Sequence, residues 1–197
     1  MQKIEEMMKN RDKSNFESSF RKENGYYLLE LRLTNLDQFF ETFDPSPFHK
    51  KDINDDAERY IVNSVEAFPL KSKLKLVFFL SEEHNKEASH VLIPAIENFF
   101  QFQAMMASRA IRSLLNEGKI SLLLGFLFLI VCIGTGAVVS LAFHNHLRAV
   151  VLEGLSIIGW VAMWRPIQIF LYDWWALYRK KKIFEKIRDM PIEIVVE

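Results

Sequence analysis

Three ionisable residues lie in or beside the apolar stretches near the C-terminal end of the chain: Glu153, Arg165 and Asp173. Ionisable groups inside a bilayer are costly and commonly serve an ion or proton pathway or a structural pair. Arg165 is expected about 24 Å along a helix axis from Ala149, close enough to one membrane surface for its head to snorkel there. Glu153 is expected to reach the opposite interface or His146, which lies about two helical turns before it on nearly the same face. An anchor is therefore favoured over a pathway.

A proline follows Arg165 directly. Pro166 removes a backbone donor and frees the carbonyl of Ala162, which predicts a kink. The Arg165 guanidinium is expected to snorkel, to serve this loosened backbone, or to hold Asp173 through paired donors.

The elements that carry these residues are two apolar stretches, 120–143 without a charged residue and 149–171 with only Glu153 and Arg165. Each is longer than the roughly 20 residues that a helix needs to cross about 30 Å of hydrocarbon. The connector between them is too short for a domain. The sequence therefore predicts a transmembrane helical hairpin over residues 119–172.

Basic residues are in excess on one side of the hairpin, whereas the connector at its other end has one, Arg148. Arg109, Arg112 and Lys119 precede it, and Arg179, Lys180, Lys181 and Lys182 follow it. Because cytoplasmic flanks carry the excess of Lys and Arg, both termini are expected in the cytoplasm. Tyr172, Trp174, Trp175 and Tyr178 are expected at headgroup depth.

Small residues suggest how the spans pack. Folding the hairpin brings Gly134 and Gly136 opposite Ser156 and Gly159. Small side chains allow helices in lipid to approach closely. Cys132, Gly136 and Ser140 extend one small face, which is expected to pack within the hairpin, with an oligomer interface as the alternative.

The remaining segments predict a small cytoplasmic domain of α/β or α+β class. Strands are expected at 26–33, 74–80 and 191–196, and helices from 35 or 37 to 43, at 53–68 with Asp52 as its cap, and at 87–117. The expected organisation is a flexible N-terminal tail (1–24), the domain (25–118), the hairpin (119–172) and a juxtamembrane segment with a C-terminal strand that rejoins the sheet (173–197).

Other chemistry finds little support in the residue patterns. The chain has 25 basic and 25 acidic residues, which gives no reason to expect nucleic-acid binding. Asp52, Asn54 and Asp56 lack the glycine and glutamate of a calcium loop, and His144 with His146 makes an incomplete metal site. Glycine-rich nucleotide loops and nucleophile elbows are absent. We expect no catalytic residue, cofactor or metal ligand.

Four segments resemble the signatures of a family of bacterial two-span integral membrane proteins to which no activity is assigned. They are FDPSPF (43–48), DAERYIV (56–62), EGLSIIGWVAMWRP (153–166) and LYDWW (171–175). The resemblance runs from about Leu31 to Val195, and relatives tend to have proline where this chain has Ala176. It implies a bacterial membrane protein but supplies no catalytic residue.

The sequence thus predicts a multi-pass protein of the bacterial inner membrane that acts as an anchored interaction or assembly module. Its expected partners are the lipid bilayer and a second copy or another membrane protein. The alternative is a small oligomeric channel or transporter component that uses Glu153 and Arg165, and an enzyme ranks third.

Overall fold

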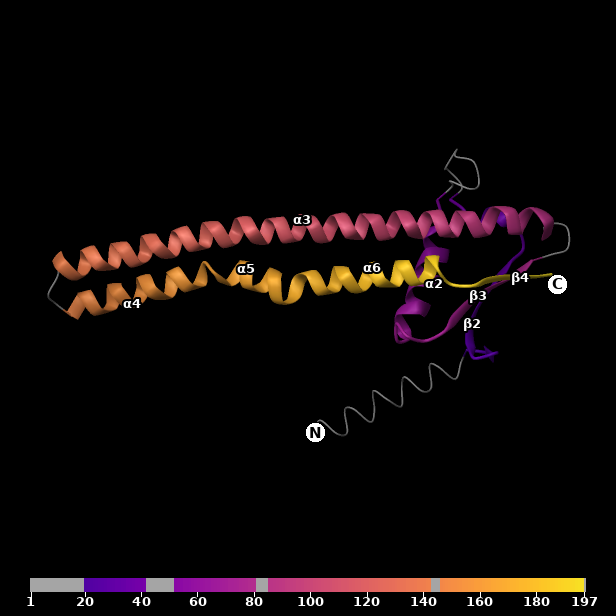
Figure 1. Ribbon diagram of the computed structural model, residues 1–197, viewed down its shortest axis with the longest axis horizontal. Coiled ribbons are helices and arrows are strands. Elements are labelled where there is room, and N and C mark those ends of the chain that lie inside the picture. The colour runs from indigo at the N-terminus through magenta and orange to yellow at the C-terminus, as the bar shows by residue number, and fades with distance from the viewer. Residues whose placement is uncertain (1–19, 42–51, 81–84, 143–145, 197) are drawn as a thin grey trace, which may run out of the picture. The chain divides into compact units, whose positions relative to one another are not determined.

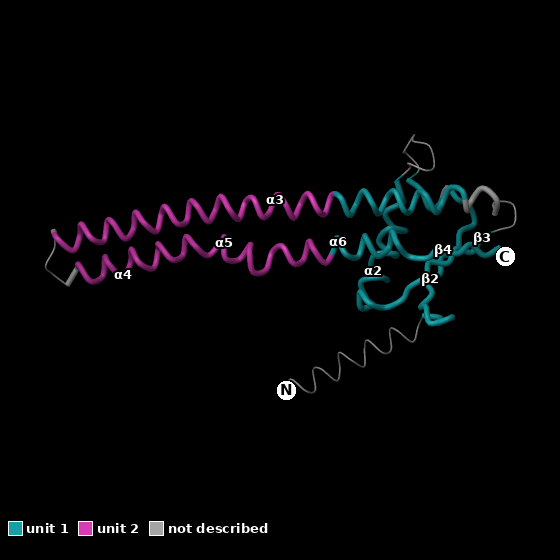
Figure 2. Tube along the Cα trace, in the orientation of Figure 1, with its two compact units in different colours: residues 1–105, 180–197 teal, residues 106–179 magenta. Residues whose placement is uncertain are grey.

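The computed structural model describes residues 20–41, 52–80, 85–142 and 146–196 (Figure 1). The chain divides into two compact units, residues 1–105 with 180–197, and residues 106–179 (Figure 2). These divisions differ from the expected hairpin limits of 119 and 172, which mark changes in hydropathy rather than in packing. The first unit is a mixed sheet-and-helix unit that fits the α+β class, and the second is helical.

The sheet of the first unit has four strands in the order β1–β2–β3–β4. They are β1 (Lys22–Glu23), β2 (Tyr26–Leu33), β3 (Leu74–Leu80) and β4 (Ile192–Val196). β3 pairs in parallel with both β2 and β4, so its continuous apolar run belongs to an interior strand, as predicted. The prediction that the C-terminal strand rejoins the sheet is confirmed.

The expected tail does not extend to residue 24. β1 pairs antiparallel with β2, with Lys22 opposite Tyr27. The turn between them has positive φ at Asn24 (49°) and Gly25 (83°), as a two-residue hairpin turn requires. The Asn-Gly dipeptide is the signal that places this strand.

Helix α2 (Asp55–Ala67) begins later than expected. Asn54 is the cap, because its side chain accepts a hydrogen bond from the backbone N–H of Asp56 at 2.9 Å. Asp52 is therefore not the cap, and Ile53 is instead buried in a bridge to Phe40. The helix ends before Phe68, whose extended backbone suits a residue that precedes proline.

One further expectation, for the segment before α2, is corrected. The helix expected from residue 35 or 37 to 43 is only a short 3₁₀ helix, Leu36–Gln38, and residues 42–51 lie outside the described part. Tyr60 of α2 is 45% exposed, and its hydroxyl donates to the Glu30 carbonyl at 3.3 Å.

The core of the first unit lies against one face of the sheet. Leu29, Leu76, Phe78 and Leu80 alternate onto this face and are buried, and the helices contribute Ile61, Val65, Ile96, Phe100, Ile183 and Ile187. Ring contacts join Phe78 to Phe39 and Phe100 to Phe184. The opposite face carries charge, including the Lys75–Glu193 ion pair across β3 and β4.

The first long helix is continuous, whereas the second span is divided into several helical segments. α3 (Asn85–Ala142) joins the expected helix at 87–117 to the first span, with Pro94 inside it and no break at Gly118. The second span comprises α4 (His146–Val161), α5 (Trp164–Gln168), a π-helix (Ile169–Asp173) and the start of α6 (Trp174–Arg188), which runs through Ala176. Two helices are long and apolar enough to cross a membrane.

Candidate functional site

Arg165 forms an ionic cluster within the second unit. Its Nη1 donates to Oδ2 of Asp173 at 2.9 Å, and its Nη2 donates to Oε1 of Glu117 at 2.7 Å. Glu117 belongs to α3, whereas Arg165 and Asp173 belong to the second helical run, which extends from α4 through α6 (146–188). The guanidinium therefore bridges the two helices through separate nitrogens, and the three side chains remain partly exposed.

The π-helix brings Asp173 onto the face of Arg165. An α-helix turns about 100° per residue, so residues eight apart diverge by about 80°. A π-turn holds one extra residue, which reduces this divergence to about 20°. Trp174 Nε1 donates to the carbonyl of Phe170 at 2.8 Å and satisfies a backbone acceptor within this widened turn.

The Ala162 carbonyl, which Pro166 leaves without its helical donor, does not accept a hydrogen bond from the Arg165 guanidinium, which was one of the expected alternatives. A Cβ atom at Gly125 would lie 2.9 Å from the Ala162 carbonyl oxygen, so this carbonyl faces the backbone of α3. The turn at Ala162 tightens as well, because the Met163 N–H donates to the Trp160 carbonyl at 3.0 Å. The guanidinium of Arg165 hydrogen-bonds to carboxylates and does not serve this loosened backbone.

Small residues on α3 follow a seven-residue spacing that the sequence reading missed. Gly118, Gly125 and Cys132 lie on one face, and added Cβ atoms at both glycines would come within 2.9 Å of the second helical run. On α4, a Cβ atom at Gly159 would lie 3.3 Å from that of Cys132. Gly134, expected in this interface, meets nothing within 4 Å.

Glu153 does not join the Arg165 cluster. The two residues are twelve positions apart, or about 18 Å along a helix. Glu153 has an exposed side chain on α4 and no ion pair with a side chain that the structure describes. Of the predicted polar residues, the structure thus unites Arg165 with Asp173, adds Glu117, and leaves Glu153 apart. The only sequence signal for Glu117 is its acidic charge beside the first span.

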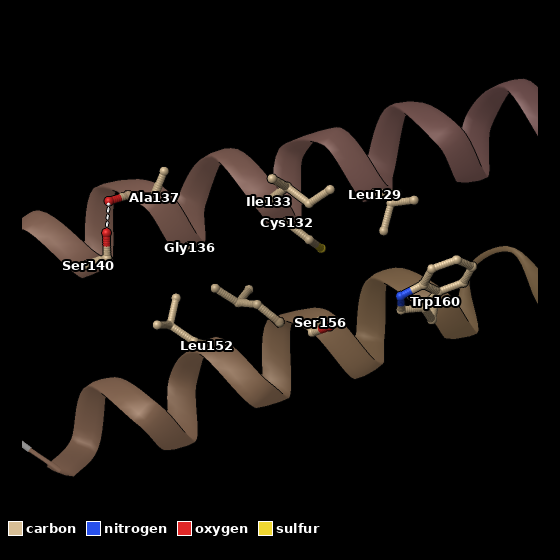
Figure 3. Close-up of a pocket in the computed structure, with 10 residues that line it drawn as sticks. Leu129, Cys132, Ile133, Gly136, Ala137, Ser140, Leu152, Ser156 and Trp160 are labelled. Atoms are coloured by element: carbon tan, nitrogen blue, oxygen red, sulfur yellow. Dashed lines mark hydrogen bonds between the residues drawn. The ribbon is translucent and has the colours of Figure 1, made fainter.

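A groove lies between α3 and α4 (Figure 3). It has a volume of about 420 Å³, and its lining includes Leu129, Cys132, Gly136, Leu152, Ser156 and Trp160. The hydroxyl of Ser140 donates to the Ala137 carbonyl at 2.7 Å and is already satisfied. The groove is mainly apolar, and Cys132, which brings a thiol to its lining, is only 5% exposed.

The basic run has local partners in the first unit. Lys181 and Lys182 both pair with Glu185, and the hydrogen bond from Lys182 is the main cause that lowers the pKa of Glu185. Arg188 pairs with Asp189, mainly lowering the pKa of that carboxyl through a hydrogen bond. Part of the positive charge of the basic run is therefore paired with carboxylates of the same domain.

A second groove, of about 260 Å³, lies between α2 and the domain part of α6. Burial and then the nearby charge of Asp55 raise the pKa of Glu58, while Lys180 opposes this shift. The Lys180 ammonium also lies 5.6 Å from the ring centroid of Phe184. The groove is thus lined by acidic and basic side chains, which suit ionic contacts and do not suggest nucleophilic catalysis.

Metal-binding geometry is not seen among the described residues, which contain no group of three His, Cys, Asp or Glu side chains suited to an ion. No family model, curated protein or solved structure matches this chain.

Proposed function

We propose that the chain is an integral membrane protein in which a two-helix hairpin anchors a small α+β domain. The exposure of the apolar helices carries this proposal, because only 17% and 11% of their most apolar windows are buried. Leu123, Phe126 and Leu141 are 61%, 53% and 81% exposed. Contiguous apolar surface of this kind is unfavourable in water and suits lipid.

The orientation that we propose places both termini in the cytoplasm of a bacterial cell, with the hairpin in the inner membrane. The excess of Lys and Arg before α3 enters its apolar part and after the second span supports this orientation. The resemblance to a family of bacterial two-span membrane proteins supports the bacterial inner membrane as the location.

The role that we propose is an anchored interaction or assembly module. Arg165 supports an anchoring part for the hairpin, since its hydrogen bond to Glu117 joins the two helices and its hydrogen bond to Asp173 fixes the guanidinium on its own helical run. The alternative is a small oligomeric channel or transporter component using Glu153 and Arg165. One observation favours this alternative: the second span is interrupted by a turn and a π-helix, and broken helices line binding sites in transporters.

Thiol labelling tests the topology. In a Cys132→Ala background, single cysteines replace Asn24, His146 or Ile194, and intact cells are treated with an impermeant thiol reagent. Position 146 should react from outside, whereas positions 24 and 194 should react only after permeabilisation. Labelling of 24 or 194 in intact cells would refute the orientation, and release of the protein by alkaline carbonate would refute membrane integration.

Ion flux in proteoliposomes separates the anchor from the pathway. We expect Arg165→Leu to lower the amount of folded protein without a specific flux defect. Normal folding with lost or altered flux would instead favour the channel or transporter.

A further inference from the structure

We propose that the outward face of the second helical run is a self-association seam that packs against the same face of a second copy. This inference rests on the proposed membrane placement. The seam consists of Glu153, Ser156, Trp160, Trp164, Ile167 and Leu171. Their spacings of three and four residues match the pattern by which two helices interlock side chains.

This seam differs from the face that contacts α3. Gly159, Pro166 and Ile169 belong to the contacting face and are buried. Trp160 and Trp164 are 64% and 71% exposed, and Leu171 is 60% exposed. The hairpin therefore leaves a second helix-packing pattern uncovered.

Polar groups on this seam argue against lipid as its natural cover. The indole N–H groups of Trp160 and Trp164 have no acceptor within the described part of the chain. Trp160 lies about 16 Å along the helix from Leu171, deeper than the interfacial belt where tryptophan is usual. Lipid tails offer neither donors nor acceptors, whereas a protein surface does.

A second copy fits because the surface contains both a ridge and a hollow. Trp160 and Ser156 form part of the groove of about 420 Å³ and also part of the seam (Figure 3). In a two-fold dimer, the indole ridge of each copy can enter the groove of the other, where the Ser156 hydroxyl accepts a hydrogen bond. Glu153 meets its own counterpart at the same depth across the two-fold axis.

The exposed area is also sufficient. The two exposed indoles and the neighbouring aliphatic side chains offer roughly 700 Å² per copy, given about 150–250 Å² for a whole aromatic side chain. Two copies would bury roughly 1,400 Å² in total, within the roughly 1,200–2,000 Å² of specific interfaces. The seam is therefore large enough for a specific dimer.

Disulfide cross-linking in native membranes tests the seam. In the Cys132→Ala background, Ser156→Cys places a thiol on the seam. Ile158→Cys is the matched control, because Ile158 is 54% exposed but lies about 200° further round the same helix. Mild oxidation should link Ser156→Cys into a dimer of twice the chain mass and leave the control monomeric. Adding Glu153→Lys should reduce the dimer roughly fivefold or more, and Glu153→Gln should keep it.

Alkaline carbonate extraction of the same membranes keeps the two proposals apart. A protein that stays in the membrane but cross-links equally at both positions, or at neither, overturns the seam and leaves the anchor intact. A cross-link from Ser156→Cys to a different protein replaces the second copy with another partner. Release by carbonate overturns the membrane placement and the seam together.

Discussion

At the scale of single residues, Gly125 allows the freed Ala162 carbonyl to lie against α3. We predict that Gly125→Ala destabilises the hairpin by roughly 1–3 kcal/mol, since the added methyl group would meet a backbone oxygen at 2.9 Å. Gly134→Ala is the matched control, because its Cβ would meet nothing and alanine favours a helix. Thermal unfolding of the detergent-solubilised protein measures both, and equal stability of the two variants would contradict this close contact.

The planar shape of the Arg165 guanidinium, and not only its charge, is expected to stabilise the hairpin. Arg165→Leu should lower Tm, because Glu117 and Asp173 lose their shared partner. Arg165→Lys should recover only part of the loss, since one ammonium lacks the planar fork that reaches two carboxylates. Arg179→Lys serves as the control for a basic residue outside the cluster. Full recovery by Arg165→Lys would show that simple snorkelling is enough.

Glu58 makes the domain sensitive to pH. Burial is the main cause that raises its pKa above 4.5, so the native state binds this proton more strongly than the unfolded state. The stability from this group is present below the unfolded pKa and is lost as pH rises through the native pKa. Glu58→Gln should therefore stabilise the domain most near neutral pH. Tm measured against pH checks this, and a constant difference between variant and parent would contradict it.

At the scale of elements, the second helical run contains a removable irregularity. Deleting Leu171 should convert the π-turn to regular α-helix and keep Asp173 on the face of Arg165. Deleting Ala176 from regular α6 should instead rotate the following helix by about 100° and take Ile183 and Ile187 out of the core. Size-exclusion profiles and Tm should show a folded protein only for the first deletion. A folded protein after deletion of Ala176 and an unfolded one after deletion of Leu171 would refute the role given to the π-helix.

At the scale of the whole molecule, the sheet is completed by residues that follow both apolar helices in the chain. Ile194 pairs with Phe78 of the interior strand. We predict that Ile194→Asp unfolds much of the first unit, because it places a charge on the apolar face of β4 and weakens the pairing with β3. Hydrogen exchange should accelerate across 74–80.

Glu193→Ala is the control for this change, because it removes only a partly exposed ion pair with Lys75. Unchanged protection of β3 in the Ile194→Asp variant would show that β4 contributes little to the sheet.

The apolar stretches, strands β2 and β3 and the C-terminal strand were predictable because each rests on a local signal. Length and hydropathy mark the long helices, and side-chain type and period mark the strands. Arg165 and Asp173 were recognisable in the same way, as charges in or beside apolar surroundings, although their pairing remained one of several options.

The tertiary structure decided which distant residues meet. Glu117 lies 48 positions before Arg165, and Gly125 lies opposite Ala162 only because the helices fold back on each other. The N-cap of α2 is Asn54 and not the predicted Asp52, because Ile53 pairs with Phe40 in a β-bridge and so lies outside the helix. Local propensity sets the period and length of an element, but register across the chain depends on packing between segments, and packing is what selected these partners.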